Sequence, residues 1–147
     1  MKLWSQLPRD AVERAVLVAG AAFKMISSYG QGRDKRRCFY LLNVKPLNDQ
    51  TLLLVTPQRE VVKRQRARAQ YPQVLVYLKP GDHEYVTAPC VVDCMSVERC
   101  PTAEIIDMAI AERLDYYHPL GQLLLAQMRF AALQSPSLNA KEKKLLT

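Results

Sequence analysis

Short apolar runs separated by tight turns fill the middle of this 147-residue chain, and they constrain its fold more than any other feature. Runs rich in apolar and β-branched residues predict strands at about Arg37–Val44, Thr51–Thr56 and Gln73–Lys79, with shorter extended pieces near Glu84–Thr87 and Cys90–Val97. Most of these runs lie too close together for the helical crossover that parallel neighbours require. The middle of the chain is therefore predicted to form a small antiparallel β-barrel.

Helices are expected on both sides of this barrel, which makes the predicted fold class α+β. Apolar residues spaced three and four positions apart predict an N-terminal helix from about Pro8 to Ser28, packed either against the core or against another subunit. Further helices are expected at about Pro101–Leu114, from beyond Pro119 to about Ser135, and from Ala140, where Asn139 and Glu142 form a capping-box pair. We interpret the chain as one domain with an N-terminal helix (1–30), the barrel (33–100) and C-terminal helices (101–147).

The composition is that of an ordinary globular domain, with 49% hydrophobic and 24% charged residues. The chain opens without a signal-peptide pattern, and no apolar stretch reaches the roughly 18 residues that a membrane-spanning helix needs. We therefore expect a soluble, cytoplasmic protein with no membrane partner.

Four cysteines raise the question of a metal site, with His83 as a fifth candidate ligand. They are Cys38, Cys90, Cys94 and Cys100. If residues 90–94 form a strand, Cys90 and Cys94 lie roughly 13 Å apart, too far to share one zinc ion. On a helix the same spacing would allow a shared metal. Buried free thiols are the preferred interpretation, and no metal or other cofactor is predicted.

Positive charge is concentrated in the first half of the chain. Residues 1–73 carry 14 Lys and Arg against 5 Asp and Glu, whereas residues 74–147 carry 7 against 9. Most of the excess lies in two clusters beside predicted strands: Arg33, Lys35, Arg36 and Arg37, and then Arg59, Lys63, Arg64, Arg66 and Arg68. These residues are candidate nucleic-acid contacts, because such clusters indicate RNA or another polyanion as the partner.

The second cluster lies in residues 57–70, which we call the basic segment. If this segment is helical, Arg59 with Lys63 and Arg64 with Arg68 are like-charged pairs one turn apart, each destabilising by a few tenths of a kcal/mol. No group nearby in the sequence relieves them, whereas a polyanion would. The alternative is a mobile, solvated loop.

Aromatic residues near the two basic clusters are candidates for stacking on nucleic-acid bases. They are Tyr29, Phe39, Tyr40 and Tyr71. Phe39 and Tyr40 point to opposite faces of a predicted strand, so at most one of them faces outward.

The order of elements around the basic segment resembles that of a known family. Basic residues lead into a predicted apolar strand (35–42), and a second strand ends in Val55-Thr56-Pro57. After the basic segment, residues 78–85 and 88–94 complete the pattern. Over about residues 33–100 this order is similar to that of the PemK/MazF-like toxin superfamily. The resemblance implies an SH3-like β-barrel with added helices, frequent dimerisation, and, in many members, endoribonuclease activity under the control of an antitoxin protein. The chain has Cys38 and Pro57 where the enzymes have a proline and a hydroxyl residue.

The resemblance also implies catalytic roles in a metal-independent cleavage that uses the RNA 2′-hydroxyl as nucleophile. Arg37 would stabilise the developing negative charge on the phosphorus, and Thr56 would position the phosphate. His83 is the candidate for proton transfer because imidazole titrates near neutral pH, and its alternative is a turn residue with a structural role. A second class of function fits the same features: a non-catalytic interaction module of phage or mobile-element origin that binds nucleic acid or a host protein.

Overall fold

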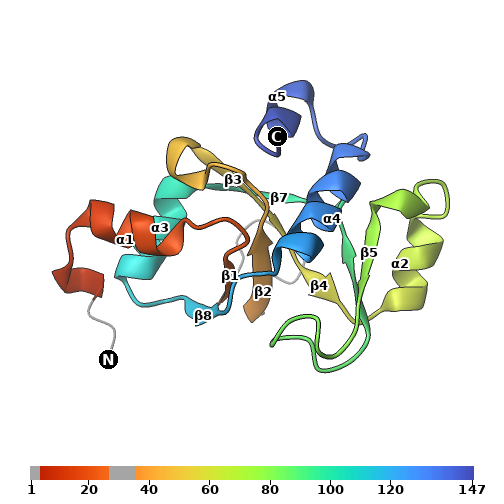
Figure 1. Ribbon diagram of the computed structural model, residues 1–147, viewed down its shortest axis with the longest axis horizontal. Coiled ribbons are helices and arrows are strands. Elements are labelled where there is room, and N and C mark those ends of the chain that lie inside the picture. Colours follow the sequence, from red (N-terminus) through yellow and green to blue (C-terminus); the bar gives the residue numbers. More distant parts are fainter. Residues whose placement is uncertain (1–3, 27–35) are drawn as a thin grey trace.

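The computed structural model describes residues 4–26 and 36–147, which form two antiparallel sheets and five α-helices (Figure 1). Sheet A has the strand order β7 (Glu98–Pro101), β3 (Thr51–Val55), β2 (Arg36–Leu41), β1 (Ala22–Ile26), β8 (Asp115–Tyr117). Sheet B has the order β4 (Pro57–Gln58), β6 (Cys90–Asp93), β5 (Leu75–Leu78). The helices are α1 (Arg9–Val16), α2 (Val61–Ala67), α3 (Thr102–Ile110), α4 (Gln122–Leu133) and α5 (Ala140–Lys144), with short 3₁₀ helices at Trp4–Gln6, Pro46–Asn48 and Pro72–Val74. The predicted α+β class with antiparallel pairing is confirmed.

The two sheets are joined by one extended stretch of chain, because β3 and β4 follow each other with only Thr56 between them. Their partners β7 and β6 are also consecutive, but the register changes between the two ladders. Leu54 pairs with Glu98, and Pro57 pairs with Val92. The step from Leu54 to Pro57 is three residues, whereas the matching step from Glu98 back to Val92 is six. The β6–β7 strand therefore contains three extra residues at the junction, in the turn 94–97, which breaks the sheet in two.

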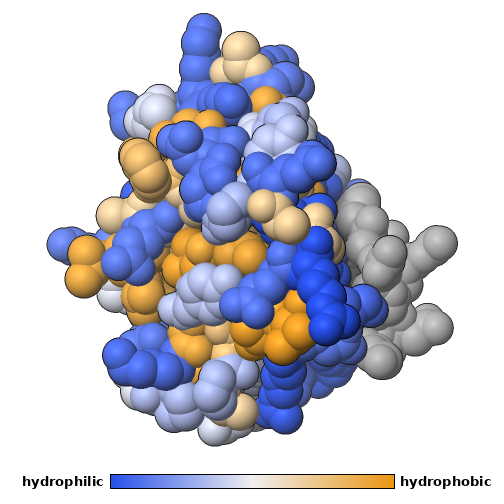
Figure 2. Space-filling model, turned by 90° about the vertical axis from the view of Figure 1, so that its right-hand side faces the viewer, coloured by the Kyte–Doolittle hydropathy of each residue, from blue (hydrophilic) through white to orange (hydrophobic). Residues whose placement is uncertain are grey.

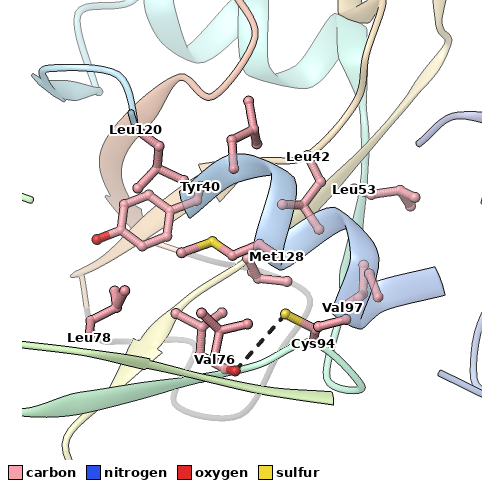
Figure 3. Packing of buried hydrophobic residues seen from close by; sticks show 14 of the residues in the cluster. Tyr40, Leu42, Leu53, Val76, Leu78, Cys94, Val97, Leu120 and Met128 are labelled. Atoms are coloured by element: carbon pink, nitrogen blue, oxygen red, sulfur yellow. Dashed lines mark hydrogen bonds between the residues drawn. The ribbon is translucent and has the colours of Figure 1, made fainter. Parts of the chain in front are cut away.

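Three apolar clusters hold these layers together. The largest lies between the inner face of sheet A, sheet B and α4, and includes Tyr40, Leu53, Val76 and Met128 (Figure 3). A second cluster covers the opposite face of sheet A with α1 and α3. A third, smaller cluster packs Val61 of α2 against the outer face of sheet B. Sheet A is thus buried on both faces, and α2 is attached to the far side of sheet B.

Within residues 4–26 and 36–147 the two sheets do not close into a barrel, because β8 and β7 form the edges of sheet A and β4 and β5 form those of sheet B. None of the helices in these ranges combines the length and the apolar character needed to cross a bilayer.

The predicted N-terminal helix to Ser28 is wrong in its second half. Helix α1 ends at Val16, Gly20 adopts a left-handed φ of +75°, and Ala22–Ile26 form strand β1 between β2 and β8. A strand that is buried on both faces reads as a nearly continuous apolar run, and over five residues such a run is indistinguishable from a helix by periodicity alone.

Other predicted boundaries changed in the same way. Residues 84–87 form no strand, the predicted strand 90–97 ends at Asp93, and the short strands β4, β7 and β8 were not predicted. Strands of two to four residues are stabilised by their neighbours more than by their own composition, which leaves little pattern in the sequence. Helices α3, α4 and α5 are confirmed, and Asn139 and Glu142 form the predicted capping box.

We expect Gly20→Ala to destabilise the protein by about 1–2 kcal/mol, because an L-residue with a Cβ is strained at positive φ. Gly20 lies in the loop that leads into β1, and a Cβ added there would also lie 3.1 Å from Cδ2 of Leu125. Urea unfolding measures the change. Gly121→Ala is the matched control, since Gly121 has φ −61° and no atom within 4 Å of the added Cβ. Equal midpoint shifts for the two variants would contradict the argument.

Candidate nucleic-acid interface

A cleft of about 600 Å³ is lined by residues from β2, the β3–β4 junction, α2 and the β6–β7 connection. Its basic lining residues are Arg37, Arg59, Lys63, Arg64 and Arg68, and its acidic ones are Glu60 and Glu98. Thr56 and Tyr85, which bear hydroxyl groups, also line the cleft. The cleft therefore joins two features that are separate in the sequence: the strand with Arg37 and the basic segment.

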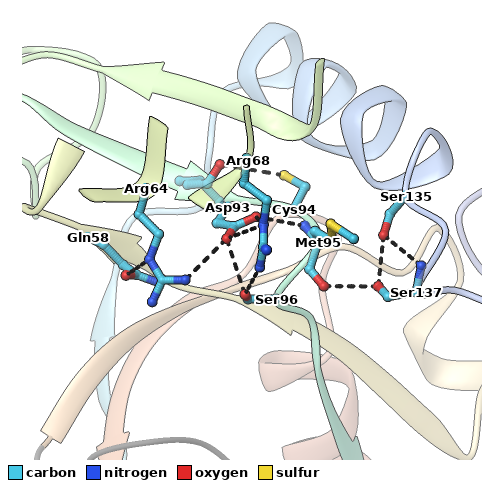
Figure 4. A network of polar contacts seen from close by, with 10 residues as sticks. Gln58, Arg64, Arg68, Asp93, Cys94, Met95, Ser96, Ser135 and Ser137 are labelled. Carbon is cyan, nitrogen blue, oxygen red and sulfur yellow. Dashed lines mark hydrogen bonds and ion pairs between the residues drawn. The ribbon is translucent and has the colours of Figure 1, made fainter. Parts of the chain in front are cut away.

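The basic segment is ordered by a carboxylate that is remote in sequence. Asp93, at the end of β6, has a side chain with 0% exposure, and Arg68 Nε donates to its two oxygens at 3.1 and 2.9 Å (Figure 4). Arg64 Nη1 reaches the same carboxylate at 3.3 Å. The Met95 N–H and the Ser96 hydroxyl also donate to Asp93. This carboxylate thereby ties α2 to the turn that separates the two sheets.

The expectation that no group nearby in the sequence relieves the like-charged pairs is wrong, because Gln58 and Glu60 do so, and the remote Asp93 relieves them as well. Arg64 and Arg68 share Asp93, and Arg64 Nε also donates to Gln58 at 2.6 Å. At the exposed end of α2, Lys63 pairs with Glu60 at 3.2 Å. The basic segment is helical over Val61–Ala67. Arg64 and Arg68 bind Asp93 and so stabilise the fold.

The remaining predicted basic contacts are dispersed. Arg59 lines the cleft and donates to the Thr87 hydroxyl at 3.2 Å. Arg36 forms an ion pair with Asp115 of β8, and Arg66 is exposed on α2 but does not line the cleft. Arg33 and Lys35 lie outside the described residues.

Arg37 and Thr56, the residues implicated by the family resemblance, both line the cleft. Arg37 is half-buried near the start of β2. Thr56 is buried, and its hydroxyl donates to the Cys38 carbonyl at 2.7 Å. In this orientation the Thr56 hydroxyl offers a ligand only its acceptor lone pairs. It can donate to a ligand only if its O–H bond rotates away from the Cys38 carbonyl.

His83 does not line the cleft, and the residue is buried, with 7% exposure. Its Nε2 lies 2.6 Å from the His118 carbonyl, to which it must donate, and its Nδ1 accepts from the Tyr85 N–H at 3.3 Å. The ring also packs edge-on against Tyr40 and Tyr117. Of the two roles open to His83, this geometry favours the structural one. His118 lies in the connection 118–121 between β8 and α4, and its carbonyl joins that connection to this network.

Tyr85 and Glu98 are among the cleft residues that were not predicted. Tyr85 stacks edge-on against Tyr117, with ring centroids 5.4 Å apart, and burial raises the pKa of its phenol while Arg59 and Arg37 oppose the rise. Glu98 sits on β7. Both belong to segments whose strand boundaries were misplaced, so the sequence pattern contained no indication of which way they point.

The predicted base-stacking residues do not gather at the cleft. Phe39 and Tyr40 are fully buried on opposite faces of β2, Tyr71 is 37% exposed, and Tyr29 lies outside the described residues. Burial raises the pKa of Tyr40 well above its usual range. Among the residues that the structure describes, Tyr85 is the aromatic side chain that lines the cleft.

All four cysteines are buried and free, as predicted. Burial raises the pKa of Cys38 and of Cys94 to about 12, so both thiols are protonated and unreactive at neutral pH. Among the described residues no group of three or more His, Cys, Asp or Glu side chains is arranged to hold a metal ion.

The face that carries α2 and β5 mixes hydrophilic side chains with separate apolar patches (Figure 2). Val62 of α2 is 58% exposed and Tyr77 of β5 is 51% exposed. Single exposed apolar residues of this kind are common on protein surfaces.

Comparison of the chain with protein-family models gave no match, and comparison with curated proteins gave none either.

Asp93→Asn is expected to destabilise the protein by about 1–3 kcal/mol, because it leaves two partly buried guanidinium groups without their counter-charge. The arginine side chains keep 23% and 21% exposure, so water offsets part of the loss. Chemical denaturation measures it. Asp10→Asn is the control, since the Asp10–Arg14 pair is exposed and is expected to contribute no more than about 0.5 kcal/mol. If both variants unfold at the same midpoint, Asp93 has no special role.

Proposed function

We propose that this protein acts on RNA through the basic cleft, as a metal-independent endoribonuclease similar to the PemK/MazF-like toxins. The observation that supports this most directly is the presence of Arg37 and Thr56 in one cleft with Arg59 and Lys63 of the basic segment. These residues come from β2, the β3–β4 junction and the region of α2, so they meet only in the folded chain.

The proposed substrate contacts follow from the charge of the cleft. Arg64 and Arg68 are held in place by Asp93, whose single negative charge offsets one of their two positive charges. Arg37, Arg59 and Lys63, whose ion pair with Glu60 is exposed, are the cleft cations that we assign to the phosphates. Arg37 would contact the scissile phosphate with its planar two-pronged donor, and Arg59 and Lys63 would contact flanking phosphates. An acidic segment of an antitoxin would be attracted to the same cations.

We further propose that the two sheets are an opened form of the SH3-like barrel. Two features support this: the β3–β4 stretch passes from one sheet to the other, and one apolar cluster is shared by both sheets. A bent strand shared between two packed sheets is how small barrels turn their corners.

A second candidate function is a non-catalytic module that binds nucleic acid or a host protein through the same cleft. The observation that favours it is the Thr56 hydroxyl, whose proton is held by the Cys38 carbonyl. Binding requires only the cations, whereas the catalytic role of Thr56 requires its hydroxyl to donate to the phosphate.

Cleavage of RNA in the presence of EDTA separates these two functions. We expect discrete products from total RNA with the unmodified protein, and for Arg37→Lys we expect a loss of cleavage with RNA affinity nearly retained. Lysine keeps the charge but loses the bidentate geometry that stabilises the transition state. The absence of any cleavage by the unmodified protein would favour the binding module.

The salt dependence of RNA binding tests the cleft cations themselves. Replacing both Arg59 and Lys63 with Gln should lower the slope of log K against log salt by about 0.7 for each phosphate that the variant no longer neutralises. Arg14→Gln, at an exposed position of α1, is the control and should leave the slope unchanged. A slope that is equally unaffected in the double variant would show that the cleft cations are only solvated.

A further inference from the structure

Phosphoryl transfer by an RNA 2′-hydroxyl needs a group that accepts the hydroxyl proton, and His83, the residue predicted for this step, lies buried outside the cleft lining. Among the described residues, the cleft lining contains two carboxylates, Glu60 and Glu98. They differ in their position. Glu60 precedes α2 and is 67% exposed, whereas Glu98 is half-buried on a strand of sheet A.

Glu98 projects from the same face of sheet A as Arg37 and Thr56. Leu54 lies directly opposite Glu98 in the β3–β7 ladder and belongs to the cluster under α1 and α3. Thr56 is two residues beyond Leu54, and Arg37 is two residues before Phe39 of the same cluster. Since side chains alternate along a strand, all three functional groups emerge on this face.

The three residues come from β7, from the position that follows β3, and from β2, in a sheet whose neighbouring strands lie about 5 Å apart. They form a diagonal row, because Glu98 pairs with Leu54, Leu54 pairs with Leu41, and Arg37 is four residues before Leu41. Thr56 therefore lies between a carboxylate and a guanidinium that both reach into one cleft. Such an arrangement can hold a phosphate on the Arg37 side while its ribose hydroxyl points towards Glu98.

We propose that Glu98 is the proton acceptor of the reaction, an inference that rests on the proposed function. The Glu98 carboxylate takes the 2′-hydroxyl proton as O2′ forms its bond to phosphorus. The bond from phosphorus to the 5′-oxygen breaks, and that oxygen takes a proton from solvent water, to which Glu98 later returns its own. The products are a 2′,3′-cyclic phosphate and a free 5′-hydroxyl, and Arg37 neutralises the charge on the phosphate oxygens between these states.

Single-turnover cleavage by Glu98→Gln tests this role, with the substrate taken from a site that the unmodified protein cleaves in total RNA. We expect the rate to fall on the order of 10²- to 10⁴-fold. Affinity for random-sequence 2′-O-methyl oligonucleotides should stay the same or tighten several-fold, because the variant removes negative charge from a cationic cleft. Retained affinity also shows that the variant is folded.

Two further variants sharpen the result. Formate added to Glu98→Ala should restore part of the cleavage rate, since a small carboxylate can enter the space left by the side chain, whereas formate should do nothing for Arg37→Lys. Glu104→Gln, an exposed carboxylate on α3 outside the cleft, should cleave at the normal rate.

The possible outcomes distinguish the role of Glu98 from the proposed endoribonuclease activity. If the unmodified protein cleaves RNA and Glu98→Gln stays within about 10-fold of its rate, Glu98 is not the proton acceptor and the endoribonuclease proposal stands. If the unmodified protein cleaves no RNA, both the endoribonuclease proposal and the role of Glu98 are overturned.

Discussion

The ion pairs of Asp93 are the interaction on which the candidate site depends. A carboxylate with no solvent exposure at the end of β6 is costly unless it is fully paired, and here it accepts from two arginines, a backbone N–H and a serine hydroxyl. Both arginines belong to the basic segment, whose helix α2 makes few apolar contacts with the rest of the chain. Electrostatic pairing, more than apolar packing, therefore determines where α2 lies and how wide the cleft is.

The same carboxylate marks the point where the sheet divides. Asp93 is the last residue of β6 before the turn with the three extra residues, and its oxygens accept from Met95 and Ser96 within that turn. The turn displaces β7 from β6, so Glu98 begins a strand of sheet A. The cleft is thus a consequence of the break between the sheets, because its walls come from both sides of that break.

This arrangement divides the positive charge of the chain into two uses. Arg64 and Arg68 stabilise the fold through Asp93, and Arg36 joins β2 to β8 through Asp115. Arg37, Arg59 and Lys63 remain at the cleft. A cluster of basic residues in the sequence therefore overstates the number of cations that a phosphate-rich partner would meet, since a remote carboxylate is invisible in the local pattern.

The elements that could be predicted from the amino-acid sequence are those whose pattern is local. Periodicity and turn residues were enough for strands β2 and β3, for the C-terminal helices and for the capping box of Asn139 and Glu142, because these depend on neighbours within a few positions. The burial of the cysteines was also predictable from residue type.

Which residues share the cleft depends instead on long-range pairing. Strand β1 exists because β2 and β8 pair with both of its edges, and His83 is buried because Tyr40 and the His118 carbonyl surround it. Glu98 and Tyr85 face the cleft because of a register change and a turn that no periodicity marks. These are contacts between residues tens of positions apart, and their energies depend on a geometry that exists only once the sheets have formed.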